Sequence, residues 1–406
     1  MIHPTRRQLL AAATAVAAMP MLSADAFHKR VASTNTPLVA MEYETWFTCA
    51  VGSAPSVAAV RSQSQNKLNA VQLAAGQSVR GITPLEQAIL KDDVDGSCST
   101  RPAAAWSGRE ATPLLGTYES SNPHVIEQHA EWITSAGVDF LLIDWSNNLG
   151  GNWSNGVGLG IMAATYSLAQ TYLRLRRHPR FALLLGLDAR VFGTQNWFDQ
   201  VDMVYDLFIQ SKELRPLYQD YLGKPLLGVF TGPRFTPPPD WSDPRFTVRW
   251  VNGFDETTHG NTMGYWSWID RQPQVTYREE SGPNGLRIIP EAVTVAAGWP
   301  GGGPSSQGGW SSNGARKHGQ TLVEQWQVAF KARPEVVLLC QWNEFNQPDQ
   351  YSVEMSNDME PTQLHGYGLH GDGGWGTYYL DLTTTMVRAF KAGKPQPKVT
   401  LNAAMP

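Results

Sequence analysis

Acidic side chains stand at the ends of several apolar runs in this 406-residue chain. The clearest run, residues 336–340, is followed within four residues by Trp342, Asn343 and Glu344. A continuous apolar run of this kind is typical of a strand that is buried on both faces, as in parallel sheets. Because α/β barrels place their chemistry at the carboxyl ends of such strands, Glu344 is a candidate catalytic carboxylate. The alternative is that Glu344 caps a turn or pairs with an arginine.

Other acids occupy equivalent places. Glu42 and Glu44 lie two residues apart, so they would share one face of an expected strand over 38–47. The acids near expected strand ends are Glu42, Glu44, Asp144, Asp188, Asp270 and Glu344. Glycoside hydrolysis needs two carboxyl groups, one to protonate the leaving oxygen and one to assist attack at the anomeric carbon. The shared position of these acids therefore indicates carboxylate catalysis, although each acid alone is more typical of a structural role.

Aromatic side chains recur at the same strand ends. Indole and phenol rings stack on apolar sugar faces, and core packing is the alternative use for each ring. The residues that we expect to contact a sugar substrate are Glu42, Glu44, Trp46, Tyr118, Trp145, Asp188, Trp268, Trp299, Trp342 and Asn343.

Expected strands and helices alternate along the chain. This pattern predicts an α/β fold, a (β/α)8 TIM barrel with long loops at the carboxyl face of the strands. We expect about eight strands, drawn from nine candidate segments: 38–47, 112–118, 138–145, 181–188, 225–230, 247–251, 264–270, 291–299 and 335–345. Helices are expected over 124–136, 161–177, 196–209 and 321–332. A doubly wound open sheet is the alternative, but no Gly-x-Gly-x-x-Gly motif follows the first strand.

Residues 1–26 resemble a twin-arginine export signal, with Arg6 and Arg7 before a short apolar run and Ala24-Asp25-Ala26 as a cleavage site. We expect residues 27–406 to form a single catalytic domain, periplasmic or secreted, with a loop excursion at about 50–110. No later run reaches the ~18 apolar residues of a membrane helix, so no membrane association is expected after signal removal. A net charge of -4 argues against nucleic acid as a partner. Nothing in the sequence indicates the oligomeric state.

Cysteine and histidine give weaker signals. Cys340 is expected to be an inert core thiol, and a disulfide between Cys49 and Cys98 is left open. The spacing of His365, His370 and Asp372 matches no common zinc site, so no cofactor or metal is expected.

Three segments together resemble glycoside hydrolase family 99 and its relatives. They are residues 118–126, residues 136–145 and the late element Gln341-Trp342-Asn343-Glu344-Phe345. The resemblance implies a (β/α)8 barrel that acts on an α-linked glycan, with α-mannans as the best-known substrates. It also implies two glutamates three residues apart, one assisting the substrate's 2-hydroxyl and the other acting as general acid. Glu344 matches the first glutamate, but Gln347 occupies the second position and cannot donate a catalytic proton.

The partner of Glu344 must then come from elsewhere. We favour Asp144 or Glu354, while Asp349 and Glu360 are further choices; the resemblance implies a structural role for Glu360. The sequence thus predicts an exported, endo-acting glycoside hydrolase that cleaves a polysaccharide or oligosaccharide. The alternatives are an inactive glycan-binding barrel protein and a metal-dependent hydrolase using His365, His370 and Asp372.

Overall fold

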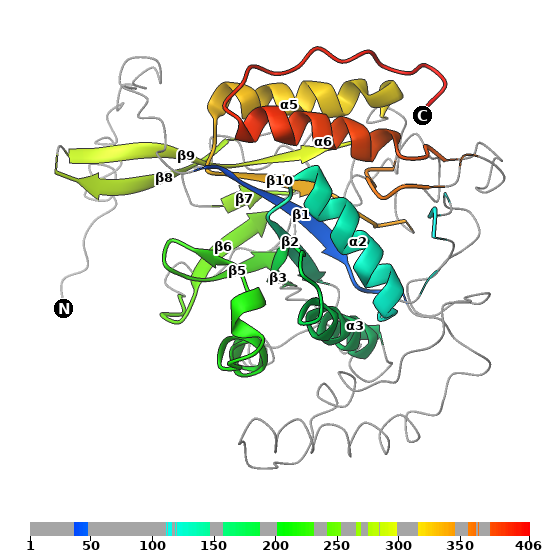
Figure 1. The fold of residues 1–406 in the computed structure, drawn as a ribbon. Helices are drawn as coiled ribbons and strands as arrows, with labels where there is room; N and C mark the ends of the chain where they lie inside the picture. The colour runs from blue at the N-terminus through cyan, green and yellow to red at the C-terminus, as the bar shows by residue number, and fades with distance from the viewer. Residues whose placement is uncertain are drawn as a thin grey trace, which may run out of the picture.

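The computed structural model describes a barrel core and its covering helices (Figure 1). The described residues are 36–47, 111, 113–115, 118, 120–146, 157–186, 201–230, 242–252, 265–268, 275–283, 285–298, 316–345, 356–362, 364 and 374–406. The predicted loop at 50–110, the export segment, Cys49 and Cys98 all lie outside these ranges.

Eight strands of the described residues run parallel in the order β7-β6-β5-β3-β2-β1-β10-β9. Their bounds are β1 Leu38–Glu44, β2 Phe140–Trp145, β3 Arg180–Gly186, β5 Lys224–Phe230, β6 Thr247–Asn252, β7 Tyr265–Ser267, β9 Gly285–Ala296 and β10 Val336–Cys340. At the remaining gap, the Thr294 hydroxyl of β9 donates a hydrogen bond to the Ser267 carbonyl of β7. The predicted α/β barrel is therefore confirmed.

Two short antiparallel additions were not predicted. Strand β4, Asp220–Tyr221, pairs with β5, and strand β8, Val275–Gly282, pairs with residues 285–293 of β9. In Figure 1 the β8–β9 hairpin projects from the barrel, and Leu286 and Ile288 on it are more than half exposed. The only sequence signal for this hairpin is the Gly282-Pro283-Asn284-Gly285 turn segment.

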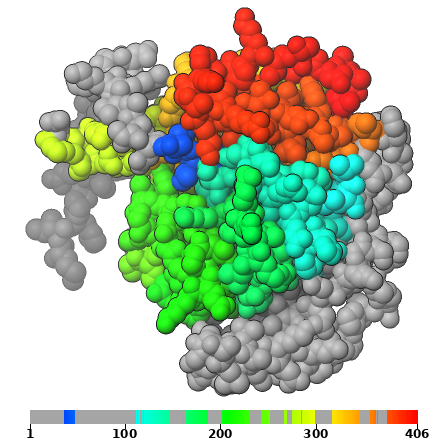
Figure 2. Space-filling view, in the orientation of Figure 1, coloured from blue at the N-terminus to red at the C-terminus, as the bar shows by residue number. Residues whose placement is uncertain are grey.

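The helices pack their apolar faces on the outside of the strands. Helix α2, Pro123–Ala136, begins where the Asn122 side chain accepts the His124 amide and ends at Gly137, whose φ of 90° needs glycine. Helix α3 covers Val157–Tyr172, α5 Gln320–Ala332 and α6 Tyr378–Lys391. Helices α2 and α6 lie side by side at the surface (Figure 2), where the Lys391 ammonium donates to the Gly137 carbonyl. Helix α6 was not predicted.

Helix predictions were otherwise close, with local differences. Helix α2 and α5 match the predicted ranges within one residue, whereas α3 ends five residues before the predicted 177. In the region predicted as helix 196–209, residues 201–204 are helical and continue into a π-helical turn, η3 Tyr205–Ile209. Short 3-10 turns lie at η4 Arg215–Leu217 and η7 Lys317–Gly319. None of the described helices is long and apolar enough to cross a membrane.

The strand predicted over 112–118 is wrong. Of its described residues, Pro113 forms an isolated bridge with Thr362, and Leu114 and Leu115 lie in a turn. Leu114 is 47% exposed and Leu115 39% exposed, so this apolar run is not the buried core that its composition indicated. The core position expected for Cys340 is confirmed, because its side chain is fully buried and forms no disulfide.

Candidate active site

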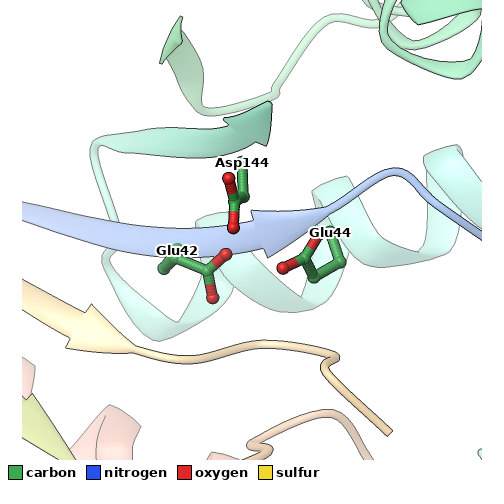
Figure 3. Close-up of side chains that lie close together, drawn as sticks. All are labelled: Glu42, Glu44 and Asp144. Carbon is green, nitrogen blue, oxygen red and sulfur yellow. The ribbon is translucent and has the colours of Figure 1, made fainter. Parts of the chain in front are cut away.

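The carboxyl ends of β1 and β2 bring three acids together. The two strands are parallel neighbours with Glu44 opposite Asp144, and Glu42 lies two residues earlier on the same face of β1. Figure 3 shows the three carboxyl groups pointing toward one another. Carboxylate oxygens of all three lie within 4.8 Å of one another. We refer to Glu42, Glu44 and Asp144 as the acidic cluster.

Burial dominates the electrostatics of this acidic cluster. Glu42 is 0% exposed, Glu44 1% and Asp144 5%. Loss of water raises the pKa of Glu42 well above its ordinary value, and the negative charge of Asp144 raises it further. Burial likewise raises the pKa of Glu44 and of Asp144, although hydrogen bonds from the Ser146 hydroxyl and amide lower that of Asp144. The ionised form of each of these groups is therefore disfavoured unless a source of positive charge compensates it.

Glu344 lies beside the acidic cluster on the loop that leaves β10. The Trp342 amide donates to the Glu42 carbonyl at 2.9 Å, which ties this loop to the end of β1. The Glu344 carboxylate accepts a hydrogen bond from the Gln341 side-chain amide. Burial raises the pKa of Glu344 well above its ordinary value, and the charges of Asp358 and Asp144 add to the effect. Unlike the acidic cluster, Glu344 is partly exposed, so it can reach a substrate.

Asp358 is a site residue that the sequence analysis missed. Its carboxylate accepts the Glu344 amide, and the Ser356 hydroxyl donates to it at 2.8 Å. Burial raises its pKa to about 7, against the lowering effect of the Arg316 guanidinium. The only sequence signal was its place between Glu354 and Glu360 in one acid-rich segment.

A buried arginine holds the Asp358 segment in place. Arg316 is 0% exposed and donates to the carbonyls of Ser356 at 2.6 Å and Asp358 at 2.7 Å. Its guanidinium stacks on the ring of Trp375 at 3.8 Å. The segment also passes so close to Gly298 that a Cβ there would lie 2.5 Å from the Ser356 carbonyl oxygen. These contacts hold Asp358 in the position where its carboxylate accepts the Glu344 amide.

Glu360 belongs to a separate buried network behind the site. The Tyr118 hydroxyl donates to Glu360 at 2.7 Å, and His129 contacts the other carboxylate oxygen at 3.1 Å. Asn343 donates to the Tyr118 hydroxyl at 3.0 Å and exchanges two hydrogen bonds with the Glu44 backbone. This position fits the structural role that the family resemblance implies for Glu360.

The aromatic residues expected to contact substrate lie in the protein interior where they are described. The five side chains Trp46, Tyr118, Trp145, Trp268 and Trp342 are each 5% exposed or less. Trp145, for example, donates its indole N–H to the Thr165 hydroxyl at 2.9 Å. Asp188, Trp299 and Glu354 lie outside the described residues, as do Asp270, Gln347, Asp349, His365, His370 and Asp372. Substrate contact by these rings stays a prediction.

Comparison with known proteins bears on the fold. No protein-family model matches the chain, and no curated protein sequence does. A solved structure of the GH99 endo-α-mannosidase from Bacteroides thetaiotaomicron, in complex with bis-tris-propane, matches with a TM-score of 0.52 at 11% identity. The match covers 88% of this chain and 98% of that one.

A second structure of that enzyme matches with a TM-score of 0.48 at 13% identity over 87% and 98% of the two chains. A glycoside hydrolase-like protein matches with a TM-score of 0.41 at 12% identity over 75% and 99%. The chain thus shares the barrel fold of the GH99 endo-α-mannosidase, as the sequence resemblance implied.

Proposed function

We propose that this protein is an exported, endo-acting glycoside hydrolase in which Glu344 is a catalytic carboxyl group. The observation that carries the proposal is the position of Glu344, partly exposed at the carboxyl end of a barrel strand, with a raised pKa. A carboxyl whose pKa is shifted toward neutral pH is suited to transferring a proton in the transition state. Its neighbours Asp144 and Asp358 produce part of that shift.

The substrate class is an α-linked polysaccharide or oligosaccharide. The late motif around Glu344 supports this choice, and so does the shared fold with an enzyme named as an endo-α-mannosidase. The second carboxyl group would be Asp144 of the acidic cluster or Glu354. Export through the twin-arginine signal would place the enzyme in the periplasm or outside the cell, where it meets such glycans.

The test is hydrolysis of a panel of α-linked polysaccharides, α-mannan among them, measured by new reducing ends and by product size. We expect wild-type protein to release internal fragments and Glu344→Gln to cut turnover by about 10²–10⁴-fold. Circular dichroism and the melting temperature should stay at wild-type values, because glutamine keeps the size of the side chain. A Glu344→Gln variant that works at the native rate would exclude this role for Glu344.

A matched control separates catalysis from general damage. Glu324 lies exposed on helix α5, away from the strand ends, and Glu324→Gln should retain full activity. Tight binding of a glycan by wild-type protein without any cleaved product would reject hydrolysis in favour of a binding protein.

A further inference from the structure

The acidic cluster has a geometry that the proposed hydrolysis by Glu344 does not use. Its three carboxylates come from two adjacent strand ends and converge on one point (Figure 3). Their oxygens lie within 4.8 Å of one another, and each residue is at least nine-tenths buried. In the described part of the chain, no arginine, lysine or histidine forms an ion pair with any of the three.

Several of these oxygens also lack hydrogen-bond donors. Both carboxylate oxygens of Glu42 and Oε2 of Glu44 are buried, and no donor from outside the acidic cluster reaches them. Figure 3 shows the Glu42 carboxylate directed toward the other two. A buried, unsatisfied carboxylate is costly, whereas buried charges that persist in proteins are paired or coordinate metals. The unpartnered oxygens of Glu42 therefore indicate a ligand that supplies positive charge.

We propose that Glu42, Glu44 and Asp144 bind one Ca²⁺ ion. Calcium takes 6–8 oxygen ligands at about 2.3–2.6 Å, so two opposed bonds span about 4.6–5.2 Å, which accommodates oxygens within 4.8 Å of one another. Three carboxylates, each able to bind through one or both oxygens, provide a hard, all-oxygen site. Ser146, which donates to Asp144 through its amide and hydroxyl, orients that ligand from behind.

This assignment changes the role of Asp144. As a calcium ligand it stays ionised, so it cannot donate the proton that glycosidic cleavage needs. Glu354 is then the remaining favoured partner of Glu344. The calcium site does not depend on the proposed hydrolysis, because ion binding is measured without any glycan.

Isothermal titration calorimetry tests the proposal directly. The purified protein is dialysed against EDTA, then into chelator-free buffer, and CaCl₂ is titrated into wild type, Glu42→Gln and the control Glu324→Gln. We expect one ion per chain in wild type and in the control, and at least about tenfold weaker binding in Glu42→Gln. Absence of binding in wild type, or equal affinity in Glu42→Gln, would overturn the proposal.

Thermal unfolding provides a second readout that does not depend on the heat of binding. CaCl₂ at 1 mM should raise the melting temperature of wild type and of Glu324→Gln, and should raise that of Glu42→Gln by less. If Glu42→Gln does not fold, Glu44→Gln replaces it in both experiments. Tighter binding of MgCl₂ than of CaCl₂ would contradict the choice of calcium, because magnesium demands smaller, near-octahedral geometry.

Discussion

Among the described residues, buried carboxylates are paired with arginine at the amino end of the barrel but not at its carboxyl end. At the amino end of the barrel, Glu291 directly precedes the part of β9 that pairs with β10, and Glu335 directly precedes β10. Glu291 is 0% exposed and lies 2.6 Å from the Arg249 guanidinium, while Glu335 lies 2.8 Å from that of Arg278. The Tyr221 hydroxyl, with its single hydrogen, lies within donating distance of both carboxylates, 2.8 Å from Glu335 and 3.1 Å from Glu291. At the carboxyl ends, no arginine or tyrosine of the described residues pairs with the acidic cluster, and both carboxylate oxygens of Glu42 lack a hydrogen-bond partner.

The pKa values follow this difference. Burial raises the pKa of Glu335, but hydrogen bonds from Arg278 and Tyr221 outweigh burial and leave that pKa below its ordinary value. At the other end, the pKa values of Glu42, Glu44 and Glu344 are all raised. Paired carboxylates can hold a fold together, whereas unpaired ones remain available for protons, cations or substrate. We therefore expect the amino-end carboxylates to stabilise the fold and the carboxyl-end carboxylates to bind ligands or transfer protons.

Breaking the amino-end pair should have the largest effect on stability. Arg249→Met leaves Glu291 buried without its cation and should lower the free energy of unfolding by about 3–5 kcal/mol. Urea denaturation monitored by tryptophan fluorescence measures the change. The matched control is Arg287→Met, which breaks an ion pair with Glu280 whose two side chains are 41% and 40% exposed, and should cost less than about 1 kcal/mol. Equal losses in the two variants would show that the buried pair has no special structural role.

The sequence predicted the acids at the carboxyl end of the barrel much better than the ion-pair network at the amino end. Glu42, Glu44, Asp144 and Glu344 were found because each follows or ends a continuous apolar run, and parallel strands must bring their carboxyl ends together. Asp358 was missed because its only signal is an acid-rich segment shared with Glu354 and Glu360, and Arg316 was missed because no local pattern marks it. Tertiary contacts alone bring Arg316 onto the carbonyls of Ser356 and Asp358.

The amino-end network could not be predicted for a related reason. Glu291 meets Arg249, 42 residues away, only after β6 and β9 have taken their places in the barrel. The false strand at 112–118 shows the opposite error, since Leu114 and Leu115 looked buried by composition but lie exposed in a turn. Apolar runs predict strands reliably only where the rest of the fold buries them.

The pH dependence of stability should sharpen the contrast between the ends. Asp358 has a folded pKa of about 7, above its ordinary 3.8, so its stabilising contribution is present at low pH and is lost as the pH rises from about 4 through 7. Glu335, with a lowered pKa, contributes stability that is complete above its ordinary 4.5 and is lost only as the pH falls below it.

In EDTA, the free energy of unfolding should therefore fall between pH 5 and pH 7, by at most about 1.4 kcal/mol per pH unit for each titrating group. Urea denaturation at intervals of half a pH unit measures the slope. Asp358→Asn should flatten it, while Glu335→Gln should leave the slope above pH 5 unchanged. A wild-type stability that rises from pH 5 to pH 7 would contradict the assigned pKa shifts.

The smallest effect is expected where a carboxyl-end acid is neutralised. In EDTA at pH 7, Glu42→Gln removes a buried group without a partner and substitutes an uncharged side chain of similar size. Its free energy of unfolding should equal that of wild type or exceed it by up to about 1 kcal/mol, in contrast to the large loss expected for Arg249→Met. Addition of CaCl₂ should favour wild type over Glu42→Gln, because wild type gains the larger binding free energy from the ion. A Glu42→Gln variant that loses several kcal/mol in EDTA would mean that Glu42 stabilises the fold itself. The two ends of the barrel would then no longer differ in the way proposed.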